Sequence, residues 1–374
     1  MRILITNNSL SAYAGTELYV RDIAIALKSR GHDPIAFSTI LGPVASELTE
    51  ASVRVVDNLN EIDEPPDVIH GHHKMETMMA LLSFPGVPAI NFCHSWHQWQ
   101  EGPIFSPRVL RYVAVDEACR ERLVEKHGVP DELVQILPNF VDLKRFGRRA
   151  NPLPARPSRA LIFSNYASET NYVRVIRDAC ANSSIALDVV GSASERSITN
   201  PESILGDYDI VFAKARCALE AMAVGVAVIL CDSSGLGPMV NSQNFHDLRP
   251  LNFGFRTLTN PIEQTRVVAE LSRYDAREAA NLTDMVRTLV DSEAVVDQLL
   301  ELYAEVIAEN RNRTPDFEKE SKAVAAYLRE LKVELSAHGA ASMRLRDKLN
   351  RIPLFGGLGT KVARMLVGNA GGRA

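Results

Sequence analysis

An arginine and a glutamate lie four positions apart in the apolar stretch ARCALEAMAVGVAVILCD, residues 215–232. Residues at i and i+4 share one face of a helix, so Arg216 and Glu220 can form an intrahelical ion pair, which contributes only about 0.3–0.5 kcal/mol. The two groups can instead hold a ligand, because a carboxylate near a helix start accepts hydrogen bonds from both hydroxyls of a ribose. An arginine and the helix N–H groups can then hold the adjoining diphosphate. The stretch follows a predicted strand at its carboxyl end, where ligands bind in parallel sheets, and this position favours ligand binding.

The first loop, NNSLSAYAGTELYV at residues 7–20, offers a second place for an anionic group. Gly15 and Thr16 open a predicted helix directly beyond the first predicted strand. A helix start has free backbone N–H groups and the positive end of the dipole, and glycine lets a ligand approach the backbone closely. The alternative is that Thr16 only caps the helix, as Ser and Thr commonly do. The loop lacks the GK[ST] sequence of a P-loop.

Three histidines lie at the end of another predicted strand, in VIHGHHK. Alternate residues of a strand face one side, so His70 and His72 have a spacing that a metal site could use. No acidic or cysteine ligand accompanies them nearby in the sequence. We therefore predict no metal site, and we expect His70, His72 and His73 to line a cleft with polar groups.

His94 follows the apolar run AINFC, residues 89–93, again at a carboxyl end. A histidine at this place can donate to a substrate hydroxyl or orient it, or it can be a hydrogen-bonded structural residue. The next residues, SWHQWQ, include Trp96 and Trp99. Aromatic side chains in such a loop can stack on sugar rings, or they can pack a lid against the domain. Both pairs of alternatives stay open at this point.

The composition is that of an ordinary globular protein, and it excludes several classes of function. The 374 residues carry a net charge of −5, which argues against a general nucleic-acid binder. Five scattered cysteines without a CxxC pair predict neither a structural zinc nor a disulfide framework, and they are typical of reduced thiols in the cytoplasm. The N-terminal residues lack the features of a signal peptide, and no run of about 18 apolar residues predicts a transmembrane helix.

Short β-branched runs alternate with helix-like segments along most of the chain, which predicts parallel, doubly wound sheets. The proline-rich segment at 148–160 shows no periodicity and is predicted to link two such halves. We predict an N-terminal Rossmann-like domain at 1–150, a C-terminal one at 151–312, and a ligand-binding cleft between them. The predicted strands are 3–6, 35–38, 53–56, 68–70, 89–93, 113–115, 134–137, 160–163, 187–190, 210–212 and 227–230, with helices at 15–30 and 172–181 among them.

The last part of the chain, residues 313–374, has a different pattern. Apolar residues recur at helical spacing from Val324 to Leu335. From residue 341 on there are seven basic residues and one acidic residue, a net charge of +6. This region is either a solvated helix with a frayed end, or a basic amphipathic element that contacts anionic lipid or a partner helix. The apolar anchors of the second interpretation are Leu354, Phe355, Leu358, Met365 and Leu366.

Five of these motifs occur in the order found in a known family. LEAMAVGVAVILCD followed by SSGLG resembles the donor-site helix, strand and loop of GT-B glycosyltransferases, particularly glycosyltransferase family 4. AGTELYVRDIAIALKSRGHD resembles the first glycine loop and helix of that family, with their GGxE and LAxxLxxRGHxV patterns. DVIHGHH, the strand end at His94, and LPNFVDLKRF, which is similar to a PNGVDxxxF turn, match in the same order. The resemblance covers roughly residues 1–310.

The resemblance implies a transferase that takes a sugar from a nucleoside diphosphate sugar, with retention at the anomeric carbon and without an essential metal or other cofactor. Glu220 would hold the ribose and His94 would contact the transferred sugar or assist at the leaving group, so these two are predicted as catalytic. The implied donor site comprises Gly15, Thr16, Asn165, Lys214, Arg216, Glu220 and a loop shaped by Gly235, Leu236 and Gly237. The implied acceptor site comprises Glu17, His72, Trp96 and Trp99.

The sequence departs from the family pattern at two places. The family commonly has another glutamate eight positions before the ribose-binding one, where this chain has Phe212. It also commonly has an arginine and a lysine after the first strand of the second domain, where the first basic residue here is Arg174. Lys214 and Arg216 are expected to balance the phosphate charge instead, and the chain resembles a divergent branch of the family.

The leading hypothesis is therefore a hexosyltransferase of cell-envelope or polysaccharide biosynthesis, with a glycan, a lipid-linked molecule or a small molecule as acceptor. We expect a cytoplasmic protein, with peripheral contact to the inner membrane face if the basic tail binds lipid. One alternative is a sugar-nucleotide epimerase, for which the sequence offers no clear acid–base pair. The other is a nucleotide-sugar-binding partner subunit whose catalytic residues have decayed, which the two departures favour.

Overall fold

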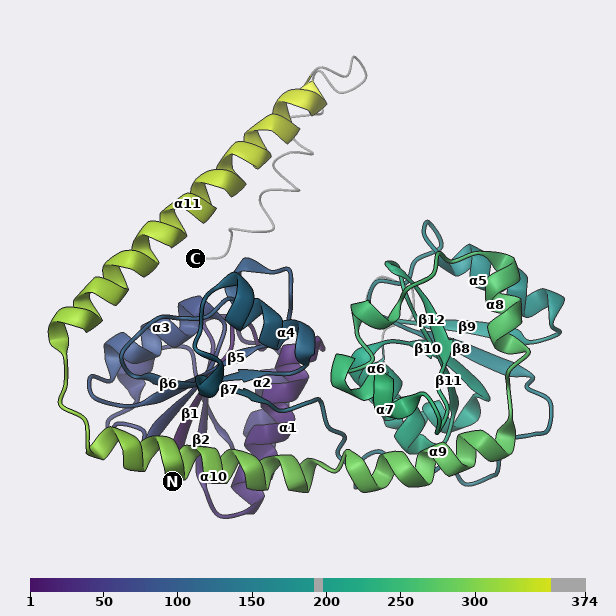
Figure 1. Ribbon diagram of the computed structural model, residues 1–374, viewed down its shortest axis with the longest axis horizontal. Helices are drawn as coiled ribbons and strands as arrows, with labels where there is room; N and C mark the ends of the chain where they lie inside the picture. The colour runs from purple at the N-terminus through teal and green to yellow at the C-terminus, as the bar shows by residue number, and fades with distance from the viewer. Residues whose placement is uncertain (192–197, 351–374) are drawn as a thin grey trace. The chain divides into compact units, whose positions relative to one another are not determined.

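The computed structural model describes residues 1–191 and 198–350 (Figure 1). The chain forms two compact units, one made of residues 1–104 and 108–314 and the other of residues 105–107 and the chain from 315 on. The larger unit contains two β-sheets with their helices. The smaller unit contains one long helix, α11 (Phe317–Asn350). The candidate site lies in the larger unit.

Within the described residues, the first sheet has seven strands, all parallel, in the order β3-β2-β1-β4-β5-β6-β7. This is the doubly wound order of a Rossmann fold, in which the strand order reverses between β1 and β4. The carboxyl ends of these two strands therefore border a crevice. The strands are β1 (Arg2–Thr6), β2 (Asp33–Phe37), β3 (Arg54–Val56), β4 (Val68–His72), β5 (Ala89–Cys93), β6 (Val109–Ala114) and β7 (Val134–Ile136).

Helices cover both faces of the first sheet (Figure 1). They are α1 (Gly15–Ser29), α2 (Pro43–Glu50), α3 (Lys74–Ser83) and α4 (Glu117–Glu121), which continues into a π-helical turn at Arg122–Lys126. A late segment, α10 (Ser292–Arg311), also packs on this half, where the hydroxyl of Tyr303 contacts His70 and Glu305 pairs with Arg111. The predicted domain division placed this helix with the second half, so its packing differs from that prediction.

The second sheet has the order β12-β11-β10-β8-β9, with four parallel strands and one antiparallel edge strand. Apart from that edge, its order is flavodoxin-like, with the reversal between β8 and β10. The strands are β8 (Arg159–Phe163), β9 (Ala186–Val190), β10 (Ile210–Ala213), β11 (Ala227–Asp232) and β12 (Gly235–Met239). The helices are α5 (Val173–Asn182), α6 (Ala215–Val224), α7 (Phe245–Leu248), α8 (Gln264–Leu271) and α9 (Ala276–Leu289).

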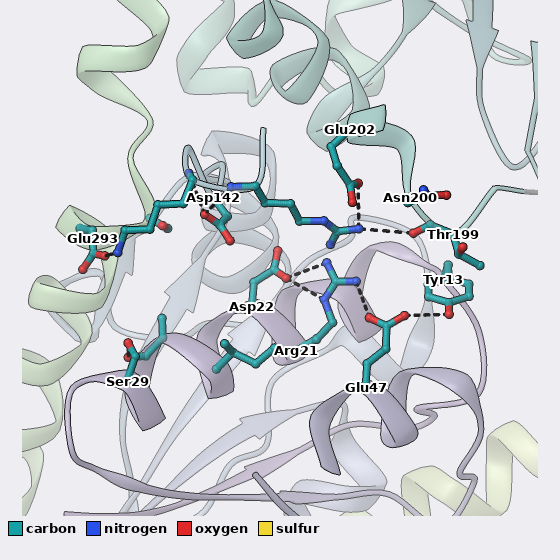
Figure 2. Close-up of a pocket in the computed structure, with 15 residues that line it drawn as sticks. Tyr13, Arg21, Asp22, Ser29, Glu47, Asp142, Thr199, Asn200, Glu202 and Glu293 are labelled. Atoms are coloured by element: carbon teal, nitrogen blue, oxygen red, sulfur yellow. Dashed lines mark hydrogen bonds and ion pairs between the residues drawn. The ribbon is translucent and has the colours of Figure 1, made fainter. Parts of the chain in front are cut away.

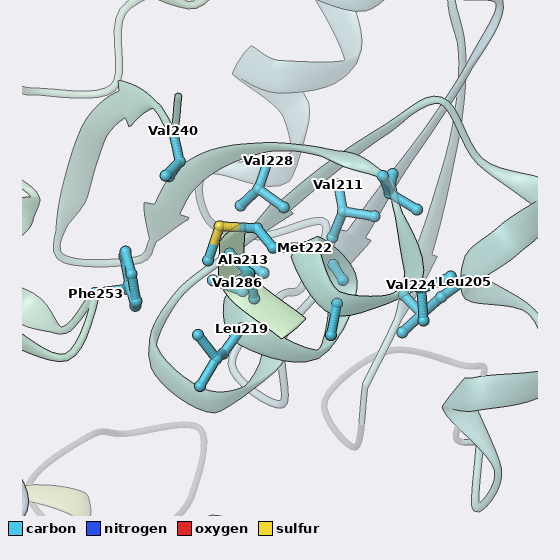
Figure 3. Close-up of a cluster of buried hydrophobic side chains, with 14 of the residues drawn as sticks. Leu205, Val211, Ala213, Leu219, Met222, Val224, Val228, Val240, Phe253 and Val286 are labelled. Carbon is cyan, nitrogen blue, oxygen red and sulfur yellow. The ribbon is translucent and has the colours of Figure 1, made fainter. Parts of the chain in front are cut away.

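The central strands of the second sheet are apolar on both faces because each face carries its own core. Val211 and Ala213 of β10 pack with α6 and α9 on one face, which Figure 3 shows around Met222 and Val286. Ile210 and Phe212 of the same strand belong to the core of the opposite face. Successive residues of a strand point to opposite faces, so a strand covered on both sides reads as one continuous apolar run. This explains why continuous apolar runs in the sequence mark these strands.

Most predicted elements are present, and one is wrong. Residues 148–158 of the predicted linker at 148–160 contain neither helix nor strand, and its last two residues begin β8. Residues Gly235, Leu236 and Gly237 were expected to form a loop, but they lie in β12, where all three are buried. A Cβ on Gly237 would lie 2.6 Å from the backbone oxygen of Thr257, so this glycine is required for strand packing.

The helical pattern at 324–335 is confirmed, because these residues lie in α11. Several apolar side chains of this helix are exposed, among them Phe317, Leu328 and Leu335. None of the described helices is both long enough and apolar enough to cross a membrane. The basic tail predicted as a lipid or partner contact lies outside the described residues, beyond residue 350, or in the last turns of α11, whose side chains are not described.

Candidate functional site

A cavity of about 460 Å³ lies between the two halves of the larger unit, at the carboxyl ends of their central strands. One wall is the start of α1 and the loop before it, and the other is formed by the ends of β8 and β9 and the start of α6. The loop after β1 and the segments after β8 and β10 therefore border the same space. Each of these strands adjoins a reversal of strand order, which is where doubly wound folds bind ligands. The polar groups of the described lining are those of Tyr13, Arg21, Arg145, Asn165, Tyr166, Thr199, Arg216, Cys217 and Glu220.

Glu220 lines this cavity although only 3% of its surface is exposed. Its Oε1 accepts a hydrogen bond from Nε of Arg216 at 2.7 Å, so the predicted i, i+4 pair exists. Burial raises the pKa of Glu220 above its usual range, against the opposing charge of Arg216. The two interpretations of the pair are thus compatible, because the ion pair fixes a carboxylate that also borders the cavity.

Arg216 joins the two halves, because its Nη2 donates a hydrogen bond to Asp22 of α1. Asp22 also pairs with Arg21 at 2.7 Å, and Arg21 pairs with Glu47 of α2 at 2.9 Å. The hydroxyl of Tyr13 donates to the other oxygen of Glu47 at 2.7 Å. Figure 2 shows the part of this network from Asp22 to Tyr13. Charges of opposite sign therefore alternate from Glu220 through Arg216, Asp22 and Arg21 to Glu47.

The described lining of the cavity has a net charge of +2, with three guanidinium groups and one carboxylate. Arg21 and Arg145 were not predicted as site residues. Arg21 lies in the second turn of α1, and Arg145 lies before the linker, where it contacts Thr199 and Glu202. No local motif marks either residue, since both reach the cavity only through the tertiary fold. Lys214, which was predicted, pairs with Asp232 at 2.8 Å and is not among the residues of this lining.

The start of α1 borders the cavity with an open backbone. The N-cap residue is Ala14 and has no side-chain cap among the described residues, so the alternative that Thr16 caps this helix is wrong. Thr16 donates instead to Glu17 at 3.0 Å. A Cβ on Gly15 would meet no atom within 4 Å, which leaves space for a group that approaches the helix N–H donors.

Gly191 borders the same cavity for a different reason. Its φ is +155°, and a Cβ there would lie 1.9 Å from the backbone oxygen of Ser164. Only glycine fits this close approach of two strand ends. Asn165, the next residue after Ser164, lines the cavity as predicted, and its Nδ2 donates to the backbone oxygen of Tyr13 at 3.1 Å.

His94 lies at the end of β5, outside the described lining of this cavity, and packs among aromatic rings. Its Nε2 is 2.7 Å from Nδ1 of His72, and its backbone N–H donates to Glu101 at 2.9 Å. Burial lowers the pKa of His94 to about 4, so its ring is neutral near pH 7. His72 lies beneath it with 0% of its surface exposed. This position does not support the predicted direct contact of His72 with an acceptor.

A buried ion pair follows the end of β4. Nε2 of His73 is 3.1 Å from Oε1 of Glu101, and both side chains are buried. Burial alone would lower the pKa of His73, but the hydrogen bond and charge of Glu101 outweigh it and raise the pKa. His73 also has a φ of +63°, a conformation that residues with a Cβ rarely adopt. Glu17, predicted for the acceptor, is buried nearby, and burial raises its pKa.

The two tryptophans of the loop after β5 contact cations. The guanidinium of Arg256 lies 5.0 Å from the ring centre of Trp96 and pairs with Glu121 at 2.6 Å. Nζ of Lys74 lies 5.1 Å from the ring centre of Trp99. Neither tryptophan is fully exposed. Both rings thus pack against cationic side chains of the protein, and the two alternatives, stacking on a sugar or packing a lid, stay predictions.

A second cavity, of about 550 Å³, adjoins the first along α1 (Figure 2). It shares Tyr13, Arg21, Arg145 and Thr199 with the first cavity, and its other charged groups are mainly carboxylates. Among the described residues, no group of three or more His, Cys, Asp or Glu side chains is arranged to hold a metal ion.

Comparison with known proteins agrees with the resemblance seen in the sequence. Residues 13–145 match the family model described as glycosyltransferase family 4. The match ends before the second sheet and covers the loop of Gly15, the histidines of β4 and the end of β5. No curated protein matches the chain by sequence.

Solved structures match the chain over most of its length. A glycosyltransferase from Rickettsia africae has a TM-score of 0.58 at 13% identity, covering 82% of this chain and 98% of that chain. Anabaena HepE, in complex with UDP and glucose, has a TM-score of 0.58 at 14% identity, covering 82% and 100%. A protein described as a UDP-N-acetylglucosamine 2-epimerase from Listeria monocytogenes has a TM-score of 0.50 at 11% identity, covering 84% and 98%.

These comparisons confirm the resemblance to glycosyltransferase family 4 and the GT-B fold, with two α/β halves and a helical C-terminal region. At such low identities, similarity of structure establishes the fold alone. Since a transferase and an epimerase both match, the activity has to be argued from the site.

Proposed function

We propose that this protein is a glycosyltransferase that uses a nucleoside diphosphate sugar as donor. The proposal depends mainly on one observation, which is that the carboxylate of Glu220 borders a cavity that also contains three guanidinium groups and an uncapped helix start. A carboxylate suits the two hydroxyls of a ribose, and the cationic groups with the helix N–H donors suit a diphosphate.

In the proposed complex, the diphosphate lies at the start of α1, against Gly15. Arg21 and Arg145 replace the basic pair that the family commonly has in its second domain. Asn165 contributes an amide at the end of β8. Because each guanidinium is already paired with a carboxylate or a carbonyl, the cationic groups are held in place before the ligand binds, and little reorganisation is needed.

The proposed reaction is a front-face displacement with retention at the anomeric carbon. The oxygen of the acceptor hydroxyl attacks the anomeric carbon on the face from which the nucleoside diphosphate departs, and the hydroxyl proton passes to the departing phosphate oxygen. The guanidinium groups and helix N–H donors stabilise the departing diphosphate. His94 contributes a neutral imidazole that orients the transferred sugar or donates to the leaving group. We propose that no metal or cofactor is needed, so that transfer continues in the presence of EDTA.

The acceptor side is proposed from the other polar groups after β1, β4 and β5. Glu17 lies in the first turn of α1, and Trp96 and Trp99 lie in the segment after β5, and they suit a hydroxylated acceptor such as a glycan or a lipid-linked sugar. The basic tail from residue 341 would hold the enzyme at an anionic membrane, in a pathway of cell-envelope or polysaccharide synthesis. Liposomes rich in anionic lipid should bind the full chain more strongly than a chain ending at 340, and equal binding would exclude this contact.

The experiment that tests the activity is incubation with a panel of UDP-, GDP-, ADP- and dTDP-sugars, with detection of the released nucleoside diphosphate. One donor is expected to be hydrolysed slowly without acceptor, and Glu220→Ala should abolish this release. Glu301→Gln, which changes an exposed carboxylate on α10, is the control and should retain the rate. Release that is unchanged in Glu220→Ala would contradict the proposed site. A product with an altered free sugar would indicate an epimerase.

A second candidate is a nucleotide-sugar-binding subunit without transferase activity. It is favoured by Phe212, which occupies the place of a family glutamate and is fully buried in the core of the sheet face opposite α6. In that case the panel would show stabilisation of the protein by one donor in thermal unfolding, but no release of nucleoside diphosphate.

A further inference from the structure

Three histidine rings stack in a row beneath the site. His70 and His72 are alternate residues of β4, and both are fully buried. Their ring centres are 4.6 Å apart, and the ring of His72 lies 4.8 Å from that of His94. Only His94 is partly exposed. Nδ1 of His72 and Nε2 of His94 are 2.7 Å apart, so one proton is shared between the two rings.

This hydrogen bond can be made in two ways, and each fixes both tautomers. If His94 donates from Nε2, then His72 accepts at Nδ1 and must carry its own proton on Nε2. If His72 donates from Nδ1, then its Nε2 is a bare lone pair and His94 carries its proton on Nδ1. Both rings are neutral near pH 7, because burial lowers the pKa of each, so no doubly protonated form competes.

The surroundings of Nε2 of His72 distinguish the two arrangements. This atom is buried and has no hydrogen-bond partner among the described residues. In folded proteins, a buried N–H without an acceptor is rarer than a buried acceptor without a donor. The arrangement in which His72 donates from Nδ1 leaves only the lone pair unpaired, and it is therefore favoured.

His70 has the same pattern one step deeper. Its Nδ1 lies 2.5 Å from the hydroxyl of Tyr303 on α10, and its Nε2 has no partner among the described residues. This contact does not fix the tautomer of His70, because either arrangement leaves one buried donor, Nε2–H of His70 or the Tyr303 hydroxyl, without an acceptor among the described residues. Tyr303 of α10 therefore contacts the deepest of the three rings, and this contact helps to fix the position of the row.

We propose that His72 is a positioning residue that fixes the tautomer of His94. By donating from Nδ1 to Nε2 of His94, it leaves His94 with its proton on Nδ1, the nitrogen that stays available to a substrate. His94 then presents an N–H donor and no lone pair, so it can donate to a sugar hydroxyl or to a departing phosphate oxygen but cannot act as a base. The use of this donor depends on the proposed function, whereas the tautomer itself does not.

The tautomers can be measured by long-range ¹H–¹⁵N NMR on the full chain labelled with ¹⁵N-histidine, which has nine histidines. His94→Asn and His72→Phe assign the two signals by their loss. The wild type should show His94 protonated on Nδ1, and His72→Phe should move that proton to Nε2. A wild-type His94 signal protonated on Nε2 would overturn the proposal. The signal lost in His94→Asn is enough to read this result, so the question is decided even if His72→Phe fails to fold.

A matched pair of variants separates positioning from packing. The amide of His72→Asn places an N–H donor near the position of Nδ1, whereas His72→Phe keeps a planar ring without a donor. If His94 donates in the transition state, turnover should fall roughly 100-fold in His72→Phe and recover largely in His72→Asn, with similar KM values. If the tautomer of His94 changes only in His72→Phe but turnover is equal in both variants, then His72 does fix the tautomer of His94. In that case the tautomer has no role in the reaction.

Discussion

The buried ion pair between Asp22 and Arg216 offers a sharp test of how the two halves are joined. Both side chains are at least 90% buried, and Arg216 is also bonded to Glu220. Asp22→Asn removes one charge and leaves the guanidinium with Glu220 as its remaining charged partner. Breaking one partner of a buried pair costs about 3–5 kcal/mol. At about 2–4 °C for each kcal/mol, the unfolding midpoint should fall by roughly 6–20 °C.

The test compares the thermal unfolding midpoints of Asp22→Asn and of a control variant, Asp284→Asn. Asp284 pairs with Arg148 at 2.5 Å, but both of these side chains are more than half exposed, so its loss should cost only about 0–1 kcal/mol. If both variants unfold at the same temperature, the Asp22 pair does not stabilise the fold, and the network from Glu220 to Glu47 does not hold the site.

The stabilisation that Asp22 contributes should depend on pH, and the shift of its pKa gives the direction of that dependence. Burial raises the pKa of Asp22, but the charges and hydrogen bonds of Arg216 and Arg21 outweigh it and lower the pKa. A carboxyl whose folded pKa lies below the unfolded value of about 3.9 stabilises the protein above that pH and loses the contribution as the pH falls further. The difference between the wild type and Asp22→Asn should thus stay constant from pH 7 to about 5 and shrink below about pH 4.

Further predictions concern the groups around the site. Turnover should show no inflection near pH 6–7 from His94, whose pKa burial lowers to about 4, and an inflection lost in His94→Asn would contradict this. Arg122, which donates to two carbonyls of the loop at 95–98, should be needed to place that loop, so Arg122→Ala should raise KM for the acceptor, and an unchanged KM would exclude the role. Gly15→Ala should fold normally but bind nucleoside diphosphate more weakly, whereas Gly191→Ala should fail to fold stably, because its Cβ would lie 1.9 Å from a backbone oxygen. Loss of folding in Gly15→Ala would refute the first part.

The fold was largely predictable because its signals are local. Continuous apolar runs such as 210–213 reflect strands that are covered on both faces, and their alternation with helices implies a doubly wound sheet. The error at Gly235 has a physical cause, since the glycines that suggested a loop are demanded by close backbone contacts in an edge strand. The return of α10 to the first half depends on long-range contacts such as that between Tyr303 and His70, which no local pattern encodes.

The site was predictable only where a motif marks it. Glu220, Gly15 and Asn165 lie in the loops or first helical turns that follow β10, β1 and β8, so topology alone brings them to one cavity. Arg21 and Arg145 were missed because a helix interior and a loop before a linker have no signature of ligand binding. His72 was predicted to contact the acceptor because the alternation of residues along a strand shows which side of the sheet each one faces. The same pattern does not show that the ring of His94 covers His72.

The central claim is that Glu220 binds the ribose of a nucleotide, and a paired comparison by calorimetry tests it most directly. The nucleoside diphosphate selected by the donor panel and its 2′,3′-dideoxy analogue would be titrated into the wild type and into Glu220→Gln. Hydrogen bonds to a charged group contribute about 1.5–3 kcal/mol, so removal of the hydroxyls should weaken binding to the wild type roughly 10- to 150-fold. The same removal should change binding to Glu220→Gln much less. An equal loss of affinity in both proteins would show that this carboxylate does not contact the ribose.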